Sequence, residues 1–338
     1  MSNIDLYRAA AKKRRIEGFN HVAKSTYTPP EMKLNKIKGR LGGKIGEGQN
    51  VAVYKMKGLG ALYRRRGLCI KVFKNSKTTW GYSGVMGESN IYESTIVQNL
   101  LAAKGLAPRV YDLVEIGGKV AQVTDLVTGS DKPVPIKDDR FTFVEHELLR
   151  PNNFLGGKLL DFQGAIFKDF HKTKKAMLNR AHTHTSFPRT ELRLYQSTDY
   201  CDAKRETKGR LSRYKFPSFE GKTVFDIGCN LGMLMRAAED NGAKRVVGID
   251  WPDMVDIAEE VAIMDGRFNL DFVGGDLKKL SHEQVQELTG IKRFDIHFFF
   301  AMEMWIGWPE WVKDCDTLFY EGHGVERPFW VKDLKSEK

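Results

Sequence analysis

The chain has 338 residues, of which 41% are hydrophobic and 29% charged, and its formal net charge is +11. This composition is ordinary for a globular protein, and the length allows two domains with separate cores. No apolar run approaches the roughly 20 residues of a membrane helix, and the N-terminus lacks the apolar core of a signal peptide. We therefore predict a cytoplasmic protein without a membrane span.

The charge is unevenly distributed along the chain. Residues 1–214 hold 39 Lys and Arg against 20 Asp and Glu, whereas residues 215–338 hold 15 against 23. The basic half predicts a polyanionic partner, such as RNA or an acidic glycan, although a solvated basic tail would give the same count. The four cysteines show no CxxC spacing, which fits a reducing compartment and argues against a disulfide framework; no metal site is predicted.

The first half begins with a basic arm, residues 1–40, and then becomes strand-like. Two strands with a glycine-rich connection are expected over residues 42–56 and a third over 68–74. A helix is expected over 90–105, followed by two strands over 109–127 that are joined by a turn at Gly117 and Gly118. These elements predict an α+β domain over residues 41–166.

Within this region, the glycine hairpin with Gly46 and Gly48 precedes Lys71 on an apolar strand and Glu93 on the helix. The order resembles the small lobe of protein-kinase-like folds over residues 41–165. The resemblance implies that the glycine loop covers the phosphates of ATP and that the lysine pairs with the glutamate.

The resemblance extends to HELLRPNN, residues 146–153, and LLDFQG, residues 159–164. It implies that Asn153 and Asp161 bind Mg²⁺, but Leu148 stands where the family has its catalytic aspartate. We therefore expect a reduced kinase-like module that binds a nucleotide without phosphotransfer. The alternative is a small β-rich domain with a glycine hairpin and a Lys–Glu surface pair.

A charged helical linker is expected over residues 167–218, and from 219 to 338 apolar strands alternate with amphipathic helices. Such alternation predicts a parallel sheet covered by helices on both faces, a Rossmann-like α/β domain. The stretch VFDIGCNLG, residues 224–232, places a glycine-rich turn between its first strand and first helix. Such a turn lets a cofactor approach the backbone and the helix N-terminus.

The spacing of this turn is Asp-x-Gly-x-Asn-x-Gly, which resembles motif I of the class I S-adenosylmethionine-dependent methyltransferases. The resemblance covers residues 190–323. It implies a loop that wraps the methionine part of the cofactor, an acid after the second strand for the ribose hydroxyls, and residues after the third strand for the adenine. The cofactor-binding residues so implied are Asp226, Gly228, Cys229, Asn230, Gly232, Asp250, Trp251, Asp276 and Leu277. A glycine turn that only packs a strand–helix corner is the structural alternative.

The fourth strand of this domain ends in FFFAMEMW, residues 298–305. Glu303 after this strand and His323 after the fifth are candidate general bases, with merely structural roles as the alternative. The strand lacks the Asn/Asp-Pro-Pro-Tyr/Phe signature of amino-group DNA methyltransferases. Because only about 15 residues follow His323, the sheet is expected to lack its last strands or to be completed from elsewhere.

These patterns favour an enzyme, an S-adenosylmethionine-dependent methyltransferase with a kinase-like N-terminal module. The acceptor stays open between a glycan or other polymer and RNA. Two alternatives remain: a non-catalytic ligand-binding or regulatory protein, and a polymer or small-molecule kinase with an accessory S-adenosylmethionine-binding domain.

Overall fold

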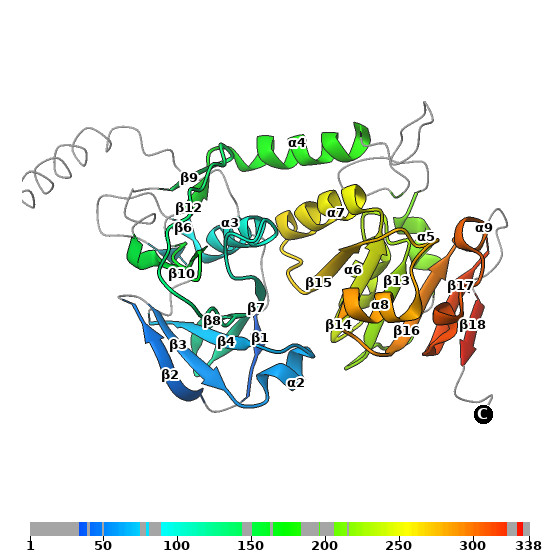
Figure 1. Cartoon of the computed structure of the whole chain (residues 1–338), viewed down its shortest axis with the longest axis horizontal. Coiled ribbons are helices and arrows are strands. Elements are labelled where there is room, and N and C mark those ends of the chain that lie inside the picture. Colours follow the sequence, from blue (N-terminus) through cyan, green and yellow to red (C-terminus); the bar gives the residue numbers. More distant parts are fainter. Residues whose placement is uncertain are drawn as a thin grey trace, which may run out of the picture. The chain divides into compact units, whose positions relative to one another are not determined.

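The structure is a computed structural model of the whole chain. It describes the backbone of residues 34–38, 41–48, 51–74, 79–80, 89–143, 151–162, 165–183, 196, 206–214, 216–322 and 330–333. The chain forms two compact units (Figure 1). The first comprises residues 1–57 and 67–173, and the second comprises residues 58–66 and 174–338.

The first unit is built on a six-stranded sheet with the order β1-β7-β8-β4-β3-β2. Its strands are β1 (Asn35–Lys36), β2 (Leu41–Glu47), β3 (Val51–Met56), β4 (Leu68–Phe73), β7 (Val110–Ile116) and β8 (Lys119–Asp125). The expected turn between the last two is confirmed, since Gly117 and Gly118 both have positive φ, 58° and 74°. Such angles suit glycine and match the twist of a two-residue hairpin.

Helix α3 (Ile91–Ala102) belongs to the same unit and is buried along almost its whole length, polar residues included. Its polar side chains find backbone partners. Asn99 exchanges two hydrogen bonds with Val110, at 2.9 and 2.8 Å, and Gln98 donates to the carbonyl of Pro108 at 2.8 Å. These bonds offset the cost of burying amides and fix the helix against the start of β7.

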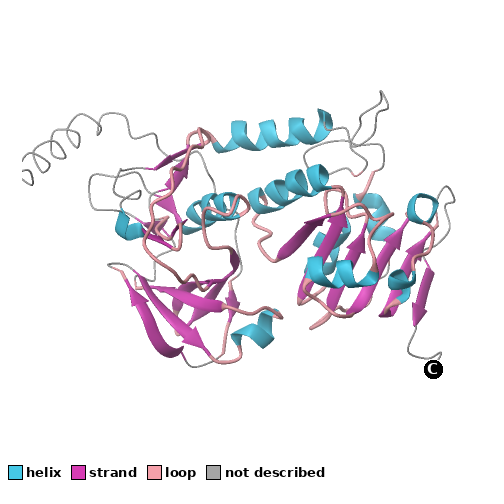
Figure 2. Cartoon of the chain, in the orientation of Figure 1, coloured by secondary structure: helices cyan, strands magenta, loops and turns pink. Residues whose placement is uncertain are grey.

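Shorter elements complete the first unit (Figure 2). They are the strand pairs β5 (Thr79–Trp80) with β6 (Ser89–Asn90), β10 (Phe154–Leu155) with β11 (Lys158–Leu159) and β9 (Phe141–Phe143) with β12 (Ala165–Phe167), and the 3₁₀ turn η2 (Pro151–Asn153). The α+β character of this region is therefore observed, while its kinase-like fold stays a prediction.

The second unit contains the expected parallel sheet, with the order β15-β14-β13-β16-β17-β18. Its strands are β13 (Thr223–Ile227), β14 (Arg245–Asp250), β15 (Leu270–Gly274), β16 (Phe294–Phe300), β17 (Cys315–Glu321) and β18 (Trp330–Asp333). All neighbours are parallel except β18, which pairs antiparallel with β17. β18 was not among the expected strands, and it adds an antiparallel sixth strand beside β17.

Helices cover both faces of this sheet. Alternate strand residues point to opposite faces, so Val224 and Phe298 enter one core and Phe225 and Phe299 the other. The first core is closed by α6 (Met233–Asp240) and α7 (Pro252–Met264), and the second by α8 (His282–Thr289) and the 3₁₀ turn η3 (Glu310–Lys313). This is the Rossmann-like arrangement that the sequence predicts.

Four further helices are described. They are α2 (Leu59–Tyr63), α4 (Phe170–Thr183), α5 (Lys208–Arg213) and α9 (Glu303–Ile306), which follows β16. The helices α4 and α5 lie in the stretch expected to be a charged helical linker, and α4 crosses the division between the units at residue 173. No helix in the described part of the chain is long and apolar enough to cross a membrane.

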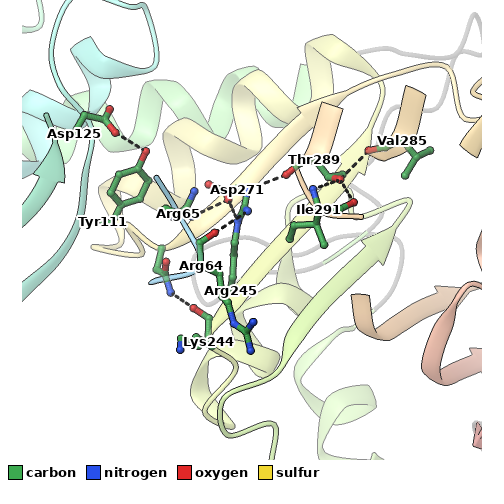
Figure 3. Close-up of polar contacts among 11 residues, drawn as sticks. Arg64, Arg65, Tyr111, Asp125, Lys244, Arg245, Asp271, Val285, Thr289 and Ile291 are labelled. Atoms are coloured by element: carbon green, nitrogen blue, oxygen red, sulfur yellow. Dashed lines mark hydrogen bonds and ion pairs between the residues drawn. The ribbon is translucent and has the colours of Figure 1, made fainter. Parts of the chain in front are cut away.

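The segment 58–66, which contains α2, lies between two strands of the first unit in sequence but belongs to the second unit. Figure 3 shows why. The Arg65 guanidinium lies 2.7 Å from the carboxylate of Asp271 on β15, and Arg245 binds the same carboxylate at 2.9 Å. Arg245 also donates to the carbonyls of Arg64 and Thr289, at 3.3 and 2.9 Å. One buried carboxylate thus joins segment 58–66 to β14 and β15.

We expect Arg65→Ala to destabilise the second unit by about 2 kcal/mol. The side chains of Arg65 and Asp271 are 9% and 12% exposed, and breaking a buried ion pair leaves a desolvated charge behind. The decrease in the free energy of unfolding stays below that for an unpaired buried carboxylate, because Arg245 still binds Asp271. Chemical unfolding of the full chain, followed by hydrogen exchange in β15, measures it. Arg66→Ala, at an exposed neighbour, is the matched control and should change nothing.

Candidate functional site

The glycine-rich turn lies where β13 ends and α6 begins, beside the carboxyl end of β14. The amides of Gly228 and Cys229 both donate to the carbonyl of Ile249, at 2.9 and 3.1 Å, so the turn is bound to its neighbour strand. β13 is flanked by β14 on one side and β16 on the other. The chain reverses its winding direction at this point, and such switch points are where open α/β sheets bind ligands.

Three residues of the turn alternate in the left-handed region: Gly228, Asn230 and Gly232, with φ of 80°, 50° and 73°. Asparagine tolerates this region far better than most residues with a side chain. The geometry therefore explains why asparagine can stand where motif I usually has its middle glycine.

The two glycines are also required by close packing. A Cβ on Gly228 would lie 2.4 Å from the sulfur of Met302, and one on Gly232 would lie 2.9 Å from the ring of Phe272. Both contacts are with protein atoms. Glycine would therefore be required at both positions whether the turn binds a cofactor or only packs a strand–helix corner.

Two buried carboxyl groups, Asp226 and Asp250, distinguish better between a binding site and a packed corner. Asp226 on β13 is 1% exposed, and its Oδ2 has no hydrogen-bond partner among the residues that the structure describes. Asp250 at the end of β14 accepts the Asn230 amide on one oxygen and its own neighbour Trp251 on the other, both at 2.7 Å. Burial raises the pKa of Asp226 to about 8, with the negative charge of Asp250 as a second cause, and burial also raises the pKa of Asp250.

Burying two acids within electrostatic reach of each other lowers the stability of the fold, and a turn with only a packing role gains nothing from them. Such pairs are typical of sites that bind or react. Hydroxyl and amine donors from a ligand would satisfy both groups. The residues present therefore fit the ribose and amino-acid parts of S-adenosylmethionine.

The raised pKa predicts a pH-dependent stability. The carboxyl of Asp226 ionises near pH 4 in the unfolded chain but only near pH 8 in the folded one. The folded state therefore binds more protons between these values, and stability falls as the pH rises through this window. Asp226→Asn should raise the thermal unfolding midpoint of the unliganded chain, and by more at pH 8 than at pH 5. An equal shift at both values would contradict the buried acid.

The remaining cofactor candidates lie around the same edge of the sheet. Trp251 is 37% exposed at the start of α7, which leaves part of its ring accessible. Asp276 follows β15, but its carboxylate is paired with Lys279 at 3.0 Å and accepts the Lys278 amide at 3.2 Å. Leu277 is 7% exposed and packs in the core. An adenine contact from Asp276 would compete with Lys279 and stays a prediction.

Glu303 begins the short helix α9 (Glu303–Ile306), directly after β16. Its Oε1 lies 3.8 Å from the position that a Cβ on Gly322 would take, and the Tyr320 hydroxyl lies 3.1 Å from the same position. Glu303 thus stands beside the ends of β16 and β17, next to the contact between Met302 and Gly228. His323, the other candidate base, lies outside the described residues.

Sequence reasoning missed several residues at this edge. Gln196 accepts the amide of Met233 at 3.2 Å, at the start of α6. Glu321 is bound by Arg210 at 2.8 Å and by the Tyr214 hydroxyl, and burial raises the pKa of Tyr214. The charged and aromatic residues of RLSRY, 210–214, were the available signal, but nothing local indicates a partner about 110 residues later in the chain.

The first unit brings three of its nucleotide-binding candidates together. The Lys71 ammonium donates to the Leu160 carbonyl at 2.9 Å, and the Leu160 amide donates to the Asn153 carbonyl at 2.8 Å. Burial lowers the pKa of Lys71, while the charge of Asp161 opposes this shift. Glu93 is fully buried and accepts the Phe167 amide at 2.9 Å. Gly46 and Gly48 lie at the end of the β2 hairpin.

The described residues hold no group of three or more His, Cys, Asp or Glu that could bind a metal ion. Cys69, Cys229 and Cys315 are buried and unpaired as disulfides, and Cys201 lies outside the described residues. Burial raises the pKa of Cys69 to about 11 and that of Cys315 to about 12. These thiols are poor nucleophiles, as a structural role requires.

Comparison with known proteins points to methyltransferases. No protein-family model matches the chain. Protein arginine N-methyltransferase 1 of Dictyostelium discoideum is 46% identical over 43 residues, which is 13% of this chain and 13% of that protein. Its counterpart in Saccharomyces cerevisiae is 38% identical over 48 residues, 14% of each chain. The chain thus matches only a small fraction of the length of these curated relatives.

Several solved structures that resemble part of the chain are methyltransferases by name. The Trypanosoma brucei PRMT1 enzyme–prozyme complex with AdoHcy is 32% identical, covers 26% of this chain and 27% of its own, and has a TM-score of 0.23. The bifunctional kinase-methyltransferase WbdD is 18% identical, covers 46% and 37%, and has a TM-score of 0.33.

Proposed function

We propose that the second unit binds S-adenosylmethionine at the turn from Asp226 to Gly232 and transfers its methyl group to an acceptor. One observation carries this proposal: two carboxylates, Asp226 and Asp250, are buried together beside a turn of alternating left-handed residues, at the switch point of a parallel sheet. A ligand rich in hydroxyl and amine donors satisfies that arrangement.

The residues present suggest a division of roles. Asp250 accepts the ribose hydroxyls with the lone pairs that its two backbone contacts leave available. Trp251 covers the adenine, and Leu277 supports this end of the site from the core. The cofactor supplies a methyl group on a positively charged sulfur, and positioning of the acceptor provides most of the rate enhancement.

Asp250 must be tested with care because its carboxylate also holds the Asn230 amide. Asp250→Ala would remove a loop contact together with the ribose contact, so Asp250→Asn is the better variant. We expect calorimetric titration to show a roughly 10- to 100-fold weaker affinity for S-adenosylmethionine, the usual cost of losing a charged hydrogen bond. Unchanged affinity would contradict the site.

Asp256→Asn is the matched control for that titration. Asp256 is exposed on α7, whereas Asp250 ends strand β14. The same change of charge there should leave both the cofactor affinity and the unfolding midpoint unaltered.

The acceptor is a separate question. The relatives named above are arginine methyltransferases, which suggests a protein nitrogen, whereas the basic first half of the chain suggests RNA or an acidic glycan as a partner.

A second candidate function belongs to the first unit, where the contacts of Lys71 favour nucleotide binding. We propose that ATP with Mg²⁺ binds near Lys71, Asn153 and Asp161, because the structure gathers these three residues from β4, η2 and the segment after β11. A partly buried ammonium within electrostatic reach of a carboxylate suits a phosphate–metal pair.

For this site, Lys71→Met should abolish ATP binding in calorimetric titration with Mg²⁺ present, and S-adenosylmethionine affinity should not change. Lys119→Met is the control, because Lys119 is an exposed lysine at the start of β8. ATP binding that survives Lys71→Met would refute this assignment, and equal losses in both variants would indicate nonspecific charge attraction.

A further inference from the structure

The segment that follows β16 lies next to the proposed cofactor turn and exposes large apolar side chains. β16 pairs with β13 through Phe299 and Ile227, and Met302 lies against Gly228 of the turn. Residues shortly after Met302 are therefore within reach of any group that the turn holds. If an acceptor approaches along this edge, this segment meets it.

Exposure in this segment is high for its residue types. Met304 is 70% exposed, Trp305 48% and Trp308 43%. Tryptophan normally buries most of its large surface, and clustered exposed apolar groups mark binding surfaces more often than chance. The three lie within five positions of one another, so they form one surface rather than scattered exposures.

The Trp308 indole is held in place from behind. Its ring centroid lies 4.9 Å from that of Phe299 and 4.9 Å from that of Tyr320, in edge and tilted contacts. Two neighbouring strands therefore fix the ring while 43% of the side chain remains accessible. A ring fixed in this way can contact a ligand with little loss of side-chain entropy.

The chemistry of this surface favours a positive charge. The Lys313 ammonium already lies over the Trp308 ring, 5.6 Å from its centroid, which shows that the ring accepts a cation at that distance. Residues 301–312 include two carboxylates, Glu303 and Glu310, and no lysine or arginine. A phosphate or uronate acceptor would meet these carboxylates with like charge.

Tyr320 connects the indole with the carboxylate of Glu303. Its ring contacts Trp308, and its hydroxyl and Glu303 Oε1 both lie near the Cα of Gly322, 3.1 and 3.8 Å from a Cβ placed there. An aromatic face, a hydroxyl and a carboxylate thus follow one another along the ends of β16 and β17. Aromatic faces with carboxylates are the groups that proteins use to bind ammonium and guanidinium ions.

We propose that the methyl acceptor is a cationic aliphatic nitrogen group, an amine or a guanidinium, and that Trp308, Tyr320 and Glu303 receive it. This inference rests on the proposed methyltransferase function and names its substrate class. It also implies that any polyanion bound by the basic half of the chain is a partner and not the methyl acceptor.

The transfer balances with these groups. The acceptor nitrogen gives up one proton to the Glu303 carboxylate, and its lone pair then forms the bond to the methyl carbon. The carbon–sulfur bond breaks with its electron pair moving to sulfur, which becomes a neutral thioether. Glu303 returns the proton to solvent, so no oxidant or reductant is required.

The test has two separate measurements on the full chain. Calorimetry with S-adenosylmethionine reports whether the cofactor binds at all. Transfer of a radiolabelled methyl group is then measured to poly-L-lysine, poly-L-arginine and ethanolamine, and to polyuridylate and polygalacturonate as anionic probes. The first three probes distinguish amine from guanidinium and polymer from small molecule.

We expect label on at least one cationic probe and none on the anionic ones. Label on polyuridylate or polygalacturonate alone, or cofactor binding without label on any cationic probe, would overturn the inference while leaving cofactor binding intact. Absence of cofactor binding would overturn the proposed function, and this inference would fail with it.

Variants at Trp308, Lys313 and Glu303 have different expected effects on KM and kcat. Trp308→Leu should raise the KM for the cationic probe about tenfold with little change in kcat, because it removes the cation-binding ring. Lys313→Gln should lower the KM, since it removes the cation that occupies that ring. Glu303→Gln should lower kcat and shift the pH profile, with a smaller effect on KM.

Cofactor affinity must stay constant in all three variants for this interpretation. Leu288→Ala is the control, because Leu288 is 42% exposed on α8, outside this surface, and its loss should change neither constant. A Lys313→Gln variant with raised KM, or a Trp308→Leu variant with unchanged KM, would refute the role of the ring.

Discussion

The second unit keeps two carboxylates, Asp226 and Asp250, in surroundings of low polarity at the ends of adjacent strands, and the rest of the site depends on this constraint. Asp250 binds the Asn230 amide and thereby fixes the middle of the turn. Burial, together with the negative charge of Asp250, raises the pKa of Asp226 to about 8. The Asp250 carboxylate thus fixes the turn although burial disfavours its charge. Hydrogen-bond donors of a ligand would stabilise that charge.

The sheet makes this constraint possible. Parallel pairing of β13 with β14 and β16 brings three strand ends to one edge in a fixed register, with Asp226 opposite Gly248 and Phe298. Gly248 allows the turn to pack closely, because a Cβ there would lie 2.3 Å from the Met235 sulfur and 2.8 Å from Cys229. Backbone pairing and close packing therefore position the two acids in advance. The acids then lose little conformational entropy when a ligand binds.

Sequence patterns predicted the strands and helices of the second unit well because hydrophobic periodicity and glycine turns are local signals. They also predicted which residues meet at the turn, since strand ends in a parallel sheet share one edge. They did not predict the binding of Glu321 by Arg210 and Tyr214, or the capping of Met233 by Gln196. Those contacts join residues far apart in sequence, and no periodicity encodes them.

The same limit applies to segment 58–66. Its sequence predicts a connection between two strands of the first unit, whereas the Arg65–Asp271 ion pair and the hydrogen bond from Arg245 to the Arg64 carbonyl join it to the second. The missed sixth strand has a different cause. β18 is four residues long, below the length at which alternation distinguishes a strand from irregular chain.

Backbone strain in the described residues also concentrates around the proposed site. Arg64, Asn230 and Ala301 are the described non-glycine residues with positive φ, and two of these three flank β13 and β16 at the same edge of the sheet. Asparagine tolerates the left-handed region, but alanine is disfavoured there by about 1 kcal/mol or more. The amide of Ala301 donates to the carbonyl of Glu321 at 2.7 Å, which holds the strained residue between β16 and β17.

This strain has a geometric consequence. A regular exit from β16 would carry the chain onward along the strand, whereas the turn at Ala301 directs Met302 onto Gly228 and places Glu303 beside Gly322. The strained residue after β16 and the buried acids on β13 and β14 are both unfavourable for stability alone. Their coincidence at a single sheet edge is what a binding site produces and what a packing corner would avoid.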